Sequence, residues 1–210
     1  MNELFTFGIL SFTSFFTLIN PLGTMPVFMT MTTELSSSAR NKTARKATIV
    51  AFFMIVFFAL TGQLMFNFFG ISVNSLRIVG GIIFFIMGQD MLQARLTKVK
   101  VDEGKVKEYV DDISITPLAI PMICGPGAIT NAIVLMQDSD TLSKKAVLFG
   151  SVFIVLLLTY IILLSSSKLI KILGDTGNKV MMRLMGLIVM VIAVEFFFSG
   201  LIPILQEAFN

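Results

Sequence analysis

The sequence predicts an all-α membrane protein with six transmembrane helices, arranged as a three-plus-three inverted-topology repeat in which helices 1 and 4 are broken. Three observations lead to this fold class: an apolar composition, six long apolar stretches, and two proline–glycine motifs at matching places in the two halves. The 210 residues are 55% hydrophobic and 14% charged, whereas an ordinary soluble domain carries about 25% charged residues. The lipid bilayer is therefore the expected solvent.

Six apolar stretches approach the roughly 20 residues that a spanning helix requires. They run over residues 4–31, 47–69, 75–92, 115–136, 146–164 and 181–205. No basic leader and no small-residue cleavage site precede the first stretch, so we expect it to stay in the mature protein. An even number of spans puts both termini on one side of the membrane.

The basic residues predict the orientation of the chain. Loops one, three and five share one side and contain twelve lysines and arginines, namely Arg40, Lys42, Arg45, Lys46, Arg95, Lys98, Lys100, Lys105, Lys107, Lys168, Lys171 and Lys179. The loops on the other side contain only Lys144 and Lys145. By the positive-inside bias, the basic loops are cytoplasmic and both termini lie outside. This distribution fits anionic lipid headgroups, and we expect no nucleic-acid partner.

A polar segment near the middle divides the chain into two repeats. Residues 96–112 read as a solvated cytoplasmic linker between a first three-helix repeat, 1–95, and a second, 113–210. Two motifs recur across it at offsets of 105 and 106 residues: Asn20-Pro21-Leu22-Gly23 as Gly125-Pro126-Gly127, and Arg77-Ile78-Val79-Gly80 as Arg183-Leu184-Met185-Gly186. Because each half has three spans, the second half enters the membrane from the opposite face, as in many secondary transporters.

Proline and glycine interrupt the first apolar stretch at Asn20 to Pro26 and the fourth at Pro117, Pro121 and Gly125 to Gly127. Prolines remove backbone donors and disfavour helix before them, and non-helical backbone at membrane depth survives only where it is buried or lines a wet cavity. A helix that starts after a break favours a carboxylate, and one that ends before it favours a cation. We predict a substrate site formed by Asn20, Pro21, Gly23, Thr24, Gly125, Pro126, Gly127, Thr130 and Asn131. The alternative is that the breaks are packing kinks and that the threonines and asparagines bond the preceding turn or a neighbouring helix.

Four ionisable residues lie in or near the third and sixth stretches: Arg77, Asp90, Arg183 and Glu195. A charge at a helix centre costs about 2.5–3.5 kcal/mol on insertion scales, so we expect pairing or a water path. We hypothesise that Arg77–Glu195 and Arg183–Asp90 pair as outer and inner gates. The alternative is that all but Glu195 snorkel to the interface. Glu195 is flanked on both sides by apolar residues and is the candidate for gating or proton coupling.

Small residues recur every seven positions in the same two stretches and predict close helix packing: Gly81 and Gly88, then Gly186, Ala193 and Gly200. The sequence has no histidine and one cysteine, Cys124. This chain alone can therefore form no disulfide, thiol–imidazole dyad or Cys/His zinc site. Phosphate loops and Ser/His/Asp arrangements are also absent from the sequence. We expect no enzyme, no metal and no cofactor.

The stretch Asn20 to Pro26 with Phe28, the run Arg77-Ile78-Val79-Gly80-Gly81 and the run Gly125 to Thr130 resemble the MarC family of bacterial integral membrane proteins over essentially the whole chain. The resemblance implies a location in the bacterial inner membrane and the inverted repeat of the LysE-type exporters. It also implies transport of small neutral amino acids, such as alanine and glycine, which some members are described as carrying.

The leading hypothesis is a secondary transporter or exporter of such an amino acid, coupled to H⁺ or Na⁺. The alternatives are a structural or assembly membrane protein without transport activity, and an exporter of metal ions or other small molecules. Substrate, coupling ion, direction and oligomeric state, including a homo-oligomer, are left open by the sequence.

Overall fold

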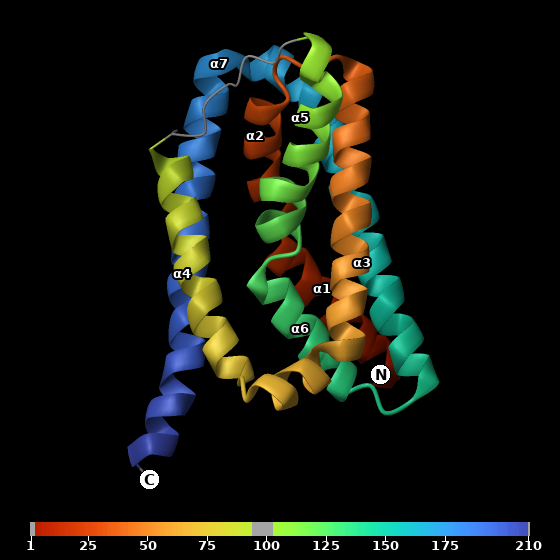
Figure 1. Ribbon diagram of the computed structural model, residues 1–210, viewed down its shortest axis with the longest axis vertical. Coiled ribbons are helices and arrows are strands. Elements are labelled where there is room, and N and C mark those ends of the chain that lie inside the picture. Colours follow the sequence, from red (N-terminus) through yellow and green to blue (C-terminus); the bar gives the residue numbers. More distant parts are fainter. Residues whose placement is uncertain (1–2, 94–102, 210) are drawn as a thin grey trace.

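The computed structural model describes residues 3–93 and 103–209, apart from the side chains of residues 103, 167–173 and 175. Every regular element within these ranges is a helix (Figure 1). In chain order they are α1 (Glu3–Ile19), α2 (Pro21–Met31), α3 (Ser37–Phe69), α4 (Val73–Leu92), the 3₁₀-helix η1 (Glu103–Lys105), α5 (Val106–Ile113), the π-type helix η2 (Ser114–Ile123), α6 (Pro126–Gln137) and α7 (Leu142–Phe209).

Five helical segments are long and apolar enough to cross a membrane: Glu3–Met31, Ser37–Phe69, Val73–Leu92, Leu142–Ser166 and Thr176–Phe209. The pair Val106–Ile123 and Pro126–Gln137, bent by 58°, makes a sixth span if it counts as one. Helix α7 supplies two of these segments because Gly174, with φ of 63°, interrupts it. The all-helical membrane class is confirmed with five to six candidate spans, and each segment contains a predicted stretch and extends beyond it. The inverted repeat and its division of the chain stay predictions.

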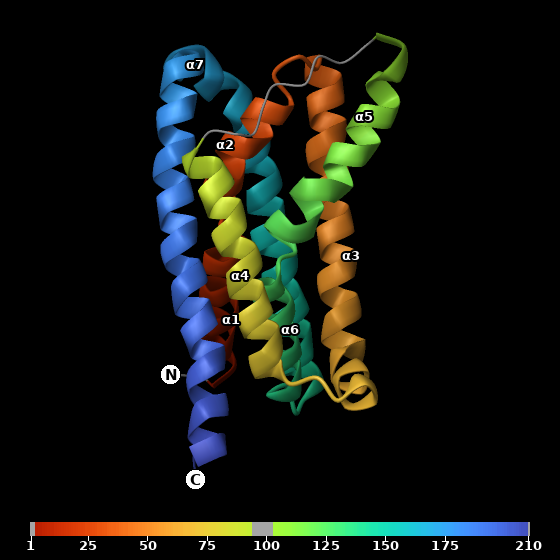
Figure 2. The same ribbon diagram turned by 60° about the vertical axis from the view of Figure 1, so that its left-hand side comes forward.

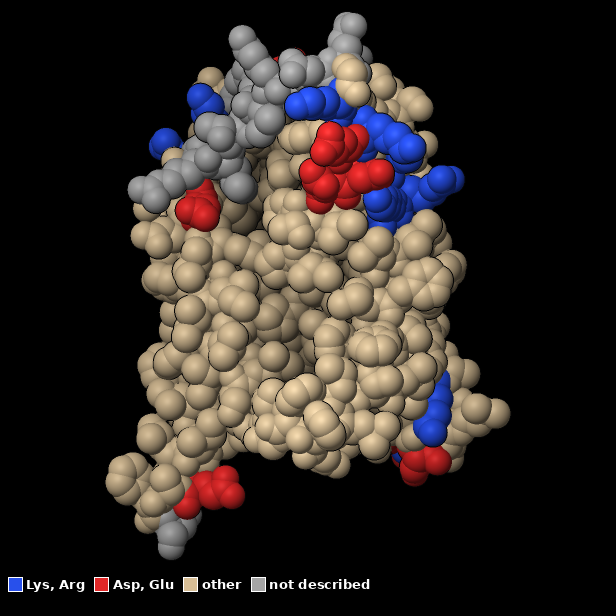
Figure 3. All heavy atoms as spheres, in the orientation of Figure 1, with Lys and Arg blue, Asp and Glu red and all other residues tan. Residues whose placement is uncertain are grey.

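The helices stand side by side along the long axis of the molecule (Figures 1 and 2). In both views α1 and α6 occupy the lower half, and α2 and α5 lie above them. The N- and C-termini lie at the lower end (Figure 1). Lysine and arginine gather at the upper end, near the starts of α3 and α5, and the middle of the face shown in Figure 3 has no charged residues in view. The basic end and the termini are therefore opposite one another.

The core surrounds α2. Nine of the eleven α2 residues are buried, and α2 packs with residues of η2 and α6 in one cluster that includes Phe28, Leu118 and Ile123. Large apolar side chains of α3, α4 and α7 are instead exposed, among them Phe53 and Leu64. A membrane protein keeps this distribution because lipid, and not water, surrounds its outer faces.

Glycines bring α4 and the second part of α7 into close antiparallel contact. A Cβ atom on Gly88 would lie 2.8 Å from the carbonyl oxygen of Gly186, and one on Gly81 would lie 2.7 Å from that of Ala193. Gly200 has equally little room, since its Cβ would lie 2.9 Å from Cβ of Arg77. The prediction of close packing at these small residues is confirmed.

The segment predicted as a solvated linker, residues 96–112, is partly helical in the structure. Residues 94–102 lie outside the described residues, but Val106–Ile113 forms helix α5, and Val110 and Ile113 pack with Leu35. The Tyr109 hydroxyl donates to the Met31 carbonyl at 2.9 Å, and Lys46 Nζ lies 2.8 Å from Asp111 Oδ1. Apolar residues recur there at helical spacing among the charges, which favours a docked amphipathic helix.

Candidate substrate site

The first helix start is at Asn20, between α1 and α2. Asn20 adopts the left-handed conformation with φ of 46°, and its Oδ1 accepts a hydrogen bond from the Gly23 N–H at 3.0 Å. Pro21 follows at the first helical position, where the missing donor costs nothing. A Cβ on Gly23 would lie 2.4 Å from Asn20 Nδ2. The Asn-Pro-x-Gly motif therefore contains every part of a helix start. Asn20 provides the turn and the cap, Pro21 is the first helical residue, and Gly23 leaves space for the Asn20 side chain.

The second helix start is at Gly125, between η2 and α6. Within η2, Thr116 and Ile120 have extended backbone, with φ of −126° and −130°. Each precedes a proline, which disfavours the helical conformation of the residue before it. Gly125 is extended, Pro126 takes the first helical position, and no side chain caps the N-terminus of α6. Helices α2 and α6 thus both begin with a proline directly after a non-helical residue.

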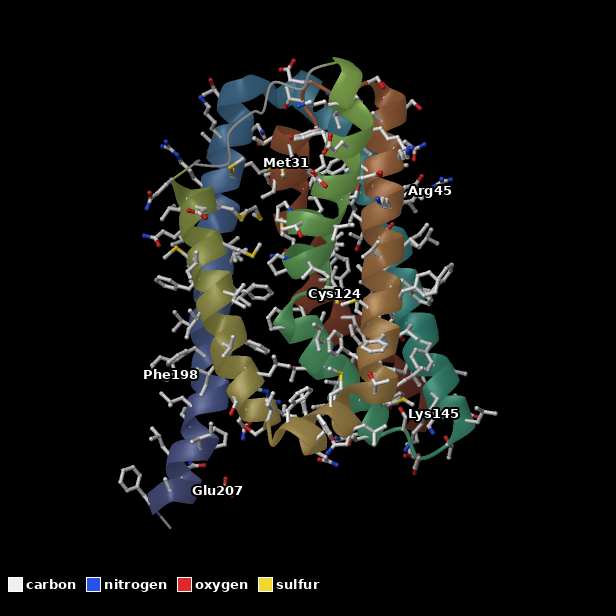
Figure 4. The ribbon with its side chains drawn as sticks, in the orientation of Figure 1. Met31, Arg45, Cys124, Lys145, Phe198 and Glu207 are labelled. Atoms are coloured by element: carbon white, nitrogen blue, oxygen red, sulfur yellow. The ribbon has the colours of Figure 1, made fainter. Side chains whose placement is uncertain are left out.

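The two helix starts lie near one another at the centre of the molecule. A Cβ on Gly127 would lie 3.0 Å from Cδ2 of Leu18, which is two residues before Asn20. On the other side, a Cβ on Gly125 would lie 2.6 Å from the Phe84 ring of α4. Cys124 marks this region about half way along the molecule (Figure 4). The end of α1, the start of α6 and the middle of α4 therefore converge at one depth.

A cavity of about 30 Å³ lies beside the first helix start. Its lining comes from α1, α2, η2, α4 and α7, and consists of Thr17, Leu18, Ile19, Asn20, Gly23, Thr24, Phe84, Met87, Met91, Met122, Val189 and Ile192. A buried water needs roughly 10–15 Å³ of such space, so the cavity has room for water. Three of the nine predicted substrate-site residues, Asn20, Gly23 and Thr24, line it.

The sequence reasoning missed the methionine part of this lining. Met87, Met91 and Met122 show no period, and no local signal separates them from the remaining methionines of the sequence. Unbranched thioether side chains adapt to irregular space. Methionine side chains therefore suit a region of the protein that changes its shape.

The family model for the MarC family integral membrane protein matches residues 5–205. The chain belongs to the MarC family. A MarC-family relative from Pyrococcus horikoshii, a UPF0056 membrane protein, is 39% identical over 196 residues, covering 93% of this chain and 94% of its own. The UPF0056 membrane protein YvbG of Bacillus subtilis is 36% identical over 201 residues, covering 94% and 95%. No solved structure matches this MarC-family chain. The relatives are named only as membrane proteins, so the similarity identifies the family and no substrate.

The other six predicted site residues of this MarC-family chain do not line the cavity. Pro21 is buried in α2, and Gly125, Pro126 and Gly127 form the start of α6. Further along α6, Thr130 Oγ1 and Asn131 Nδ2 are buried without a hydrogen-bond partner among the described groups. An unpaired buried polar group costs about 1–3 kcal/mol. These two atoms are therefore available to a polar group that enters beside α6.

The threonines of the first helix start behave differently. Thr24 Oγ1 donates to the Asn20 carbonyl at 3.2 Å, and Thr30 Oγ1 donates to the Pro26 carbonyl at 3.0 Å. Both hydroxyls bond the preceding turn, which was the alternative interpretation from the sequence. Thr30 also accepts a hydrogen bond from Asn178 Nδ2 at 3.0 Å, so α2 is bonded to the second part of α7 by a contact that the sequence did not predict.

The hypothesised cross-pairs Arg77–Glu195 and Arg183–Asp90 do not form. Among the described side chains, ion pairs join only Lys46 to Asp111, and Lys144 to Glu3 and to Asp140. Arg77 lies against Gly200, and its Nη1 donates to Asn74 Oδ1 at 3.4 Å. Glu195 and Arg183 are exposed. The antiparallel register places Arg77 five residues from Glu195 along α7, and the rotation of α7 turns Glu195 away from α4.

Carboxylates are also absent from the cavity lining. Among the side chains that the structure describes, no group of three His, Cys, Asp or Glu comes together in a way that could hold a metal ion. The polar groups of this region are side-chain amides, side-chain hydroxyls and the peptide groups at the helix ends. These groups bind small polar solutes by hydrogen bonds and dipoles.

Proposed function

We propose that this MarC-family protein is a secondary transporter of a small neutral amino acid of the alanine or glycine type. The solute binds between the starts of α2 and α6, close to Asn20 and Gly127. The observation that carries the proposal is the convergence, at one depth, of two helices that each begin with a proline after a non-helical residue.

The directions of these helices suit a zwitterion. Helix α2 runs from the centre toward the basic end, and α6 runs from the centre toward the termini (Figure 2). Their N-terminal, positive dipole ends therefore both face the centre, where they favour a carboxylate. Because α6 has no side-chain cap, its first N–H groups are the more available. The last turn of α1 offers carbonyl groups, which suit an ammonium.

The same two helices support the inverted repeat. Helix α2 has 11 residues and α6 has 12, both start with proline, and they point in opposite directions. In our proposal residues 1–95 and 113–210 are the two repeats, and the transport path lies between them. The basic end faces the cytoplasm of a bacterial inner membrane, and both termini face outward.

The proposal requires a conformational change. A cavity of about 30 Å³ admits water and no amino acid, so α4 and the second part of α7 must separate from the start of α2 for a solute to enter. The methionines Met87, Met91 and Met122 can repack during such a movement.

Transport by the purified full-length chain in liposomes tests the proposal. Uptake of labelled alanine, glycine and serine is measured with and without proton and sodium gradients, against protein-free liposomes. We expect protein-dependent uptake of at least one of them, and the gradient that drives accumulation identifies H⁺ or Na⁺ as the coupling ion. Uptake equal to that of protein-free liposomes under every gradient contradicts amino-acid transport. The remaining alternatives are then an assembly protein without transport activity and an exporter of metal ions or other small molecules.

A further inference from the structure

An exposed stripe runs along the second part of α7. Its members alternate in spacing between four and three residues, and seven of the eight are large apolar side chains that are 44–86% exposed. We call this set the α7 stripe: Leu184, Ile188, Val191, Glu195, Phe198, Ile202, Leu205 and Phe209. The spacing is that of a heptad, by which one helix packs along another, and the neighbouring Leu187 and Val194 are exposed as well.

The α7 stripe lies on the side of the helix opposite α4. Gly186, Ala193 and Gly200 occupy the α4 side, as their close contacts with α4 show. Phe198 points away from the rest of the molecule in Figure 4. No described helix covers the stripe, and the end of α7 with Glu207 projects beyond the other helices (Figures 1 and 4).

Glu195 is the single ionisable residue of the α7 stripe, at its centre. Gly81, the ninth residue of the 20-residue helix α4, contacts Ala193 and Phe197, on either side of Glu195. The carboxyl group is therefore near the middle of the span. No described side chain forms an ion pair or hydrogen bond with it. Ionisable residues in membrane spans almost always face a bundle interior or a water-filled cavity. The α7 stripe accordingly belongs to the interior of a larger assembly.

We propose that the α7 stripe is the interface of a homodimer, in which the Glu195 carboxyl groups of two copies hydrogen-bond to each other. Most homo-oligomers are closed by two-fold symmetry. A two-fold axis along the membrane normal brings Glu195 of each copy to the same depth. A protonated carboxyl donates its O–H to the carboxyl oxygen of the other copy, so each carboxyl group finds its hydrogen-bond partner in the other copy. A different partner protein would need a matching group at that depth.

The apolar members of the stripe supply the packing. With its side chains spaced four and three apart, two α7 helices can interdigitate at a small crossing angle, as most membrane helix pairs do. One polar residue within an apolar heptad pattern also selects register and oligomeric state. Glu195 has that position, with three stripe members before it and four after it.

Cysteine cross-linking in lipid vesicles tests the interface. The test variants are Val191→Cys and Phe198→Cys. The controls are Leu60→Cys and Phe57→Cys on α3, because the exposed fractions match: 57% against 56%, and 49% for both phenylalanines. The native Cys124 is 1% exposed and serves as the background in the unmodified chain. We expect covalent dimers from the α7 variants at high lipid dilution and not from the α3 variants. Equal yields from both helices, or no dimer from α7, overturn the proposal.

Energy transfer between labelled copies tests the carboxyl contact. Glu195→Gln keeps a donor and an acceptor, so we expect its association constant to stay within about threefold of the native value. Glu195→Leu keeps the apolar stripe but removes the hydrogen bond, and we expect a fall of roughly 3- to 30-fold. Association of Glu195→Leu at the native strength overturns the contact. If that variant does not fold, a strong fall for Glu195→Gln overturns it instead. These measurements report association only and are independent of the proposed transport.

Discussion

Pro126 packs directly against Gly80. A Cβ on Gly80 would lie 2.5 Å from Cβ of Pro126 and 3.0 Å from the Phe196 ring. The first residue of α6 is therefore placed against α4 at a position where only glycine leaves room. Phe196 of the second part of α7 takes part in the same contact. Helices α4, α6 and α7 therefore pack closely together at the point where Gly80 has no side chain.

Gly80→Ala should destabilise the protein because the added methyl group forces α6, α4 or α7 apart. Overpacking of this kind costs about 1–3 kcal/mol, and a lower midpoint of thermal unfolding in detergent measures it. Gly150→Ala is the matched control: its Cβ meets nothing within 4 Å, and alanine in a helix is about 0.5–1 kcal/mol better than glycine. Equal midpoints for the two variants would show that the Gly80 contact is not close.

Variants of Asn20 should rank in stability as Asn above Gly above Ala. Glycine accepts the left-handed backbone and, as an N-cap, costs only a few tenths of a kcal/mol, whereas alanine as an N-cap costs about 0.5–2 kcal/mol. Alanine is also strained at φ of 46°. Unfolding midpoints check the order, and alanine ranking above glycine would contradict the left-handed conformation. Both variants lack the amide, so both should lose transport if Asn20 binds the solute.

Pro21→Ala and Pro126→Ala should reduce amino-acid uptake to the level of protein-free liposomes. Alanine restores a backbone donor and lets helix continue through the helix start, which closes the proposed site. Uptake in liposomes is the measurement, and circular dichroism checks that the variants are folded. Pro203→Ala, inside α7 and outside the cavity lining, should transport normally. Unchanged uptake by both test variants would count against the site.

Acid should loosen the first turn of α7. Lys144 Nζ lies 2.8 Å from Glu3 Oε1 and 3.1 Å from Asp140 Oδ1, and its hydrogen bond keeps the pKa of Asp140 below the usual value. A lowered folded pKa means that this stabilisation is complete above the unfolded value of about 3.9 and is lost as pH falls through the folded pKa. Hydrogen exchange of the first turn of α7 should rise in that range. Asp140→Asn should show a smaller rise, and an equal rise in both proteins would contradict the contribution of Asp140.

The helix positions could be predicted from the sequence because their causes are local. Long apolar stretches require helix in lipid, and Asn20-Pro21 and Gly125-Pro126 interrupt helix through their own backbone chemistry. The structure places the two starts of α2 and α6 at these residues. Helix α5 was missed because its many charges concealed the spacing of Val106, Tyr109, Val110 and Ile113.

Rotation and register could not be predicted in the same way. Nearly every position around the second part of α7 is apolar, so no contrast marks the face that packs on α4. The hypothesis that Glu195 pairs with Arg77 assumed an inward orientation, whereas the glycines at positions 81, 88, 186 and 200 turn Glu195 outward. The bond between Asn178 and Thr30 depends on the same long-range packing.

The cavity of about 30 Å³ beside Asn20 is bordered on one side by the apolar side chains of Phe84, Met87 and Met91. Protons and sodium ions cross a membrane protein along connected files of water, and an apolar constriction that excludes water interrupts such a file. If the protein transports as we propose, we expect this conformation to hold no continuous file of water past these side chains and so to conduct neither protons nor sodium ions. In our proposal, the carrier in this conformation would not dissipate the ion gradients that drive it.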